Sequence, residues 1–77
     1  MERRLSELNP GESGIISRIE GRGEERRKLL DMGLVRGTRI TVVRRAPLGD
    51  PIELLVRGYN LSLRLDEAEG VYVKPVE

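Results

Sequence analysis

The stretch Arg45-Ala46-Pro47-Leu48-Gly49-Asp50-Pro51 lies between two runs of residues that have the pattern of β-strands. The run before it, residues 38–44, reads TRITVVR, and the run after it, residues 52–57, reads IELLVR. The stretch is too long for a two-residue hairpin turn. Its two prolines restrict φ to about −65° and favour an extended residue before each of them. We therefore expect two strands that are joined by a stiff loop.

This loop is expected to display Leu48, a large apolar side chain, close to its tip. Rigid loops that present apolar residues are frequent contact sites. In a second interpretation, Leu48 folds back onto the end of a barrel, and the sequence does not separate the two. The roles of Arg45 and Asp50 also have two interpretations. They either form the charged rim of a contact surface or pair with each other across the loop.

Outside the loop, the periodicity predicts three more strands, over residues 14–20, 61–65 and 71–74. A helix is expected over residues 24–32, with Gly33 in the left-handed conformation of a helix C-cap. Glu24 and Lys28 are spaced to pair along this helix. Residues 66–70 are predicted to form a helical or 3₁₀ turn, and residues 1–4 to be frayed. Leu5 and Leu8 can hold the entry segment against the core.

Five short strands and one helix in 77 residues indicate a small barrel or rolled sheet. On the first strand we place Ile15 and Ile19, rather than Ile16, on the inner face. On the helix we place Leu30, rather than Leu29, in the core. The expected core comprises Ile15, Ile19, Leu30, Leu34, Ile40, Val42, Ile52, Leu54, Val56, Leu61, Leu63, Val71 and Val73.

Three segments carry a family resemblance: residues 29–38 (LLDMGLVRGT), 42–52 (VVRRAPLGDPI) and 56–64 (VRGYNLSLR). Together they resemble the FeoA family, small cytosolic accessory proteins of bacterial ferrous iron transport. The resemblance extends from Leu5 to Val73. It implies a mainly β fold, a small SH3-like barrel of about five strands with one short helix inserted after the first strand. It also implies that residues 1–77 form one such domain.

The composition argues against several classes of function. The chain has no cysteine and no histidine, so it lacks disulfides and the usual nitrogen and sulfur ligands of transition metals. We expect no catalytic residues, no cofactor and no bound metal. The net charge of +1 is not the excess of a typical nucleic-acid binder. No apolar run is long enough to span a membrane and no signal peptide is evident, so we expect a cytosolic protein.

The resemblance implies a partner, the membrane transporter FeoB with its cytosolic GTP-binding domain. A contact surface for such a partner should be an apolar patch with a charged rim. The predicted partner-binding residues are Leu29, Met32, Arg45, Leu48, Asp50 and Tyr59. For Leu29 and Met32, burial in the core is the competing interpretation. The exposed strand edges of a small barrel also leave pairing with a second copy open.

Two other functions remain as alternatives. The chain also resembles the SH3-like domain of diphtheria-toxin-repressor-type metal regulators, although no helix-turn-helix part precedes it and Met1 favours a stand-alone protein. A small nucleic-acid-binding barrel could use the arginines on its strands, but stacking aromatics are scarce. Binding of proline-rich peptides is disfavoured, because the chain has two Tyr and neither Trp nor Phe to line a groove.

Overall fold

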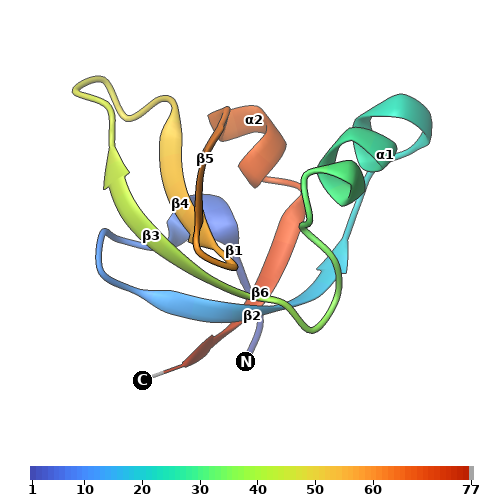
Figure 1. Ribbon diagram of the computed structural model, residues 1–77, viewed down its shortest axis with the longest axis horizontal. Helices are drawn as coiled ribbons and strands as arrows, with labels where there is room; N and C mark the ends of the chain where they lie inside the picture. The colour runs from blue at the N-terminus through green and yellow to red at the C-terminus, as the bar shows by residue number, and fades with distance from the viewer. Residues whose placement is uncertain (77) are drawn as a thin grey trace.

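The structure, a computed structural model, describes residues 1–76 and is built on one antiparallel sheet of six strands (Figure 1). The strands are adjacent in the order β1-β6-β2-β3-β4-β5. The mainly β architecture was predicted; the sixth strand, β1, was not. In chain order the elements are β1 (Arg3–Arg4), the 3₁₀ turn η1 (Leu5–Glu7), β2 (Ser13–Ile19), α1 (Gly23–Asp31), β3 (Arg39–Arg45), β4 (Ile52–Val56), β5 (Tyr59–Leu63), α2 (Leu65–Ala68) and β6 (Val71–Val76).

The N-terminal residues form a strand, so the prediction that residues 1–4 are frayed is wrong. Arg3 and Arg4 pair with Val73 and Tyr72 of β6. Just before them, the carboxylate of Glu2 accepts hydrogen bonds from the Ser17 hydroxyl at 2.6 Å and from Arg18 Nε at 3.2 Å. These two donors hold the pKa of the Glu2 carboxyl below its ordinary value.

Two irregularities in the strands decide which side chains face the core. The register of β2 against β6 shifts between Ile16 and Arg18, and the register of β3 against β4 shifts between Val42 and Arg44. Each shift is the signature of a β-bulge, in which one extra residue lies opposite a single partner residue. Strict alternation of inner and outer side chains therefore fails after Ile16 and again after Val42.

The core is close to the predicted one, with two exchanges. Ile16 is buried, whereas Ile15 is only half-buried. The bulge after Ile16 changes the phase of the rest of β2, so Ile19 shares the inner face with Ile16 rather than with Ile15. Ile19 and Leu61 pack against the core without being fully buried. Leu5 and Leu8 are fully buried and attach the N-terminal segment to the core, as predicted. The buried apolar residues are Leu5, Leu8, Ile16, Leu29, Leu34, Ile40, Val42, Ile52, Leu54, Val56, Leu63, Ala68, Val71 and Val73.

The second exchange, Leu29 for Leu30, follows from how α1 ends. Gly33 has the expected positive φ, at 93°. Its N–H bonds to the Leu30 carbonyl at 3.0 Å, and the Leu34 N–H bonds to the Leu29 carbonyl at 3.1 Å. This pair of bonds is the Schellman motif, in which the residue after the glycine packs against the residue four positions before that glycine. Leu34 and Leu29 are therefore buried together, and Leu30 is left half-buried at the rim.

We expect Gly33→Val to destabilise the protein by about 1–2 kcal/mol, because a β-branched residue is strained at positive φ. No atom lies within 4 Å of the position that a Cβ would occupy, so crowding does not contribute. Gly33→Asn is the matched control and should cost less, since asparagine tolerates this conformation. Urea unfolding measures both variants. Equal losses would show that the backbone conformation is not the cause.

An ion pair links the two helices, α1 and α2, where the sequence had predicted an ion pair within α1. Lys28 Nζ lies 2.9 Å from Glu67 Oε2, so Lys28 bridges α1 to α2 instead of pairing with Glu24 as the spacing predicted. The Lys28 ammonium, with help from the Arg64 N–H, holds the pKa of the Glu67 carboxyl below its ordinary value. Glu67 therefore contributes stability above its unfolded-state pKa, and this contribution is lost as the pH falls through the lower folded-state pKa.

Lys28→Gln should raise the pKa of Glu67 and lower the free energy of unfolding at neutral pH by less than about 1 kcal/mol, because the pair is solvent-exposed on the lysine side. The difference from the parent should vanish at an acidic pH below the lowered folded-state pKa of Glu67, where this carboxyl is protonated in both proteins. Thermal unfolding at the two pH values tests this. Arg26→Gln, on the same helix and without an ion pair among residues 1–76, is the control and should show no such pH dependence.

Candidate functional site

The loop between β3 and β4 projects from the sheet at the upper left of Figure 1 and displays Leu48. The Leu48 side chain is 96% exposed, so the loop does not fold it back onto the barrel. Within the loop, the Ala46 N–H bonds to the Pro51 carbonyl at 3.0 Å, and the Gly49 N–H bonds to the Ala46 carbonyl at 2.7 Å. The Leu48 loop, residues 46–51, is therefore closed by its own backbone.

Arg45 fixes one end of the Leu48 loop to the N-terminal segment. After the bulge in β3, Arg45 pairs with the buried Ile52 and points to the inner face of the sheet. Its Nη2 donates to the carbonyls of Ser6 and, at 2.7 Å, of Leu8. Within residues 1–76 Arg45 forms no ion pair with Asp50, so the predicted pairing across the loop is wrong. Arg45 is half-buried, and its role at the rim of a contact surface stays a prediction.

Asp50 fixes the other end of the loop to α2. Its Oδ1 accepts a hydrogen bond from the Leu65 N–H at 3.0 Å, at the first residue of α2. A free N–H at the start of a helix needs an acceptor, and here a distant aspartate supplies it. The sequence pattern predicted that Leu65 is the last residue of a strand over residues 61–65. This prediction is wrong, because Leu65 is the first residue of α2.

The other predicted contact residues do not gather around Leu48. Leu29 is only 4% exposed and Met32 packs against the core, so Leu29 is excluded as a surface contact. Tyr59 is exposed, but it follows β4, whereas the Leu48 loop precedes β4. The six residues that were predicted to bind a partner therefore do not form one patch. Of these six, only Leu48 lies at the tip of the loop.

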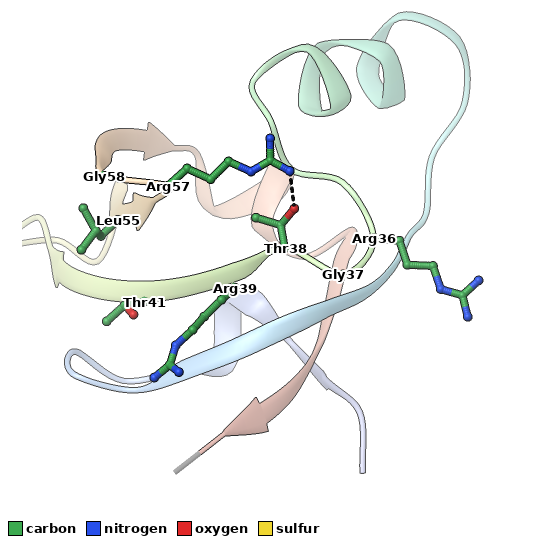
Figure 2. A pocket seen from close by; sticks show the side chains of 8 residues that line it. All are labelled: Arg36, Gly37, Thr38, Arg39, Thr41, Leu55, Arg57 and Gly58. Atoms are coloured by element: carbon green, nitrogen blue, oxygen red, sulfur yellow. Dashed lines mark hydrogen bonds between the residues drawn. The ribbon is translucent and has the colours of Figure 1, made fainter.

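A second site, which was not predicted from the sequence, lies where β3 begins. It is an open pocket of about 540 Å³ that we call the arginine pocket (Figure 2). Its lining combines the turn before β3 with the end of β4 and the turn after it, because β3 and β4 are paired. The lining residues are Arg36, Gly37, Thr38, Arg39, Thr41, Leu55, Arg57 and Gly58.

The turn from β4 to β5 gives this pocket an unusual feature. Val56 pairs with Tyr59, so only Arg57 and Gly58 form the turn, and both have positive φ, at 52° and 84°. Two-residue turns of this kind favour asparagine or glycine at the first position. Here an arginine occupies it, and its Nη2 donates to the Thr38 hydroxyl at 3.2 Å.

Residues 1–76 contain neither a cluster of metal-ligating side chains nor a helix that could span a membrane. No three Asp or Glu side chains in this range are grouped so that they could hold a metal ion, and the chain has no His or Cys. None of the helices in the same range has the length and apolar character needed to cross a bilayer.

The FeoA domain family model matches residues 3–75. The chain belongs to the FeoA family. It is 48% identical over 71 residues to a ferrous iron transport protein A–transporter FeoB fusion protein of Porphyromonas gingivalis. That match covers 92% of the chain but only 8% of the fusion protein.

Solved FeoA structures have the same fold. A FeoA-like protein of Clostridium acetobutylicum is 41% identical, with a TM-score of 0.92 over 99% of this chain and 88% of that one. Stenotrophomonas maltophilia FeoA, solved with zinc and described as a prokaryotic SH3 domain protein, is 28% identical, with a TM-score of 0.79 over 96% of this chain and 89% of that one. The predicted SH3-like fold is thereby confirmed.

The resemblance to metal-dependent repressors is one of fold alone. A manganese-dependent transcriptional repressor superimposes with a TM-score of 0.88 at 20% identity, over 97% of this chain and 42% of that one.

We expect Arg45→Met to destabilise this FeoA-family chain by about 1–3 kcal/mol, because the carbonyls of Ser6 and Leu8 lose a charged donor in a partly buried position. Its neighbour Arg44 is the matched control. Arg44 is exposed, and Glu53 is its one ion-pair partner within residues 1–76, so Arg44→Met should cost less than about 1 kcal/mol. Urea unfolding distinguishes the two. A larger loss from Arg44→Met would contradict the assigned role of Arg45.

Proposed function

We propose that the chain is a non-catalytic accessory protein of ferrous iron transport that binds a FeoB-type transporter on its cytosolic side. Its FeoA domain is 48% identical to part of a protein in which iron transport protein A and transporter FeoB are fused. Domains that are fused in one organism commonly meet as separate chains in another. The absence of histidine and cysteine from the chain removes the commonest general bases and nucleophiles.

The observation that carries this proposal is the exposure of Leu48 on a loop that is fixed at both ends. Exposing a leucine completely has no stabilising effect on the folded chain, because apolar side chains are stabilised by burial. A loop that is already ordered loses little further entropy when a partner covers it. Leu48 therefore has the properties of an apolar anchor that enters a pocket on the partner.

Leu48→Asp should leave the fold intact and weaken binding to the FeoB-type transporter of the same organism by about 10-fold or more, since an anchor residue typically contributes above 1–2 kcal/mol. Leu48→Met, which keeps an apolar side chain, should bind within about threefold of the parent. The detergent-solubilised transporter is titrated with and without GTP at physiological salt.

The outcomes separate folding from binding. An unchanged melting temperature with lost binding supports the Leu48 loop as the contact. Loss of folding in Leu48→Asp would contradict the exposed position of Leu48. Full binding by Leu48→Asp would rule out the loop as the contact, and no binding by the parent chain would overturn the proposed partner. A response to GTP would assign a role in the transporter's nucleotide cycle.

A further inference from the structure

The arginine pocket lies at the opposite end of β3 from the Leu48 loop. Arg39 and Thr41, in the first half of β3, line the pocket, whereas the Leu48 loop follows Arg45 at the end of the strand. The pocket is therefore a second surface, and what it binds can be tested without reference to the transporter.

The charge of the pocket is not neutralised by the chain itself. Three of its lining residues are arginines and none is acidic. Within residues 1–76, none of Arg36, Arg39 and Arg57 lies in an ion pair, whereas Arg3, Arg18 and Arg44 each pair with a glutamate. Like charges gathered without counter-charges attract an anionic partner.

The arrangement of the arginines favours several separated negative charges over one small anion. In Figure 2, Arg57 reaches toward Thr38, Arg39 extends below the start of β3, and Arg36 points away from both. Three guanidinium groups that bind one phosphate would converge on one point, which these do not. An extended chain with charges along its length matches them better.

Arg57 adds an independent indication that the pocket is functional. It holds φ at 52°, where asparagine or glycine would be more stable. Residues in sparsely populated backbone conformations cluster at binding sites, where the side chain is needed. Arginine at this position is accounted for if its guanidinium group serves a ligand.

We propose that the arginine pocket binds an extended acidic segment of a protein partner, with Asp or Glu side chains beside the arginines and one apolar side chain against Leu55. Leu55 lines the pocket and is 41% exposed, so it offers apolar contact. A single-stranded nucleic acid would add stacking of its bases on aromatic rings, but neither tyrosine of the chain lines the pocket. The net charge of +1 is also not the excess of a typical nucleic-acid binder. The occupant is therefore a peptide.

The test uses a short fluorescein-labelled peptide rich in Asp and Glu with one central Leu, and measures its Kd by anisotropy at low and physiological salt. The variant Arg36→Gln/Arg39→Gln/Arg57→Asn should bind about 10-fold more weakly, as expected for the loss of three partly exposed ion pairs. Asparagine is chosen at position 57 because it suits the positive φ, so the single variant Arg57→Asn should be at least as stable as the parent.

The control variant Arg22→Gln/Arg26→Gln/Arg27→Gln removes the same charge from exposed positions at α1. It should change the Kd by less than about twofold, because these distant arginines attract the peptide only through long-range electrostatics, which salt screens. Equal weakening in the two triple variants would overturn the proposal, since the peptide would then respond only to net charge.

Two further measurements test where the peptide binds and whether the pocket prefers it to a nucleic acid. Backbone amide NMR shifts on peptide addition should concentrate at Thr38, Leu55 and Gly58, and shifts confined to other residues would overturn the proposal. A single-stranded oligonucleotide of equal charge should bind more weakly than the peptide. Tighter oligonucleotide binding that is lost in the pocket variant would replace the peptide by a nucleic acid and so contradict the proposal.

Discussion

The position of Arg45 depends on a single extra residue in β3. Without the bulge between Val42 and Arg44, Arg45 would point to solvent, and Arg44 would turn toward the core. With the bulge, the Arg45 guanidinium group holds the carbonyls of the N-terminal segment, and the segment in turn buries Leu5 and Leu8. The loop that displays Leu48 starts at the next residue. One irregular position therefore connects the packing of the N-terminus to the presentation of the exposed leucine.

A second irregular position has the same kind of effect in β2. The bulge after Ile16 shifts the alternation of β2 by one residue, so that Ile19 packs against the same core as Ile16, and β2 and β6 are paired on both sides of the bulge. Gly14 allows the close approach of the two strands, because a Cβ at its position would lie only 2.9 Å from Val73 Cβ. Small β-domains have few core residues, and an extra residue in a strand is a direct way to choose which of them face inward.

The sequence predicted regular features well and irregular ones poorly. The alternation of Ile52, Leu54 and Val56 gave the inner face of β4 correctly, and Gly33 marked the end of α1. Periodicity cannot detect a bulge, so Ile15 and Arg45 were misplaced. Leu29 could have been identified from the sequence, because the Schellman motif pairs the residue after the glycine with the residue four positions before it. The arginine pocket could not, since its lining depends on the register of β3 against β4, and the bulge after Val42 shifts that register by one residue.

The position of β3 between the Leu48 loop and the arginine pocket has a consequence for avidity. β3 pairs with β4 over Ile40–Arg45 and with β2 over Arg39–Thr41, so both of its ends are held in one sheet and keep a constant separation. Any molecule that engages one end meets the other at a high effective concentration, provided that the spacing of its own two contacts matches the spacing of the two sites. Two individually weak contacts can then give durable association, and partners with a different spacing gain nothing from the second contact.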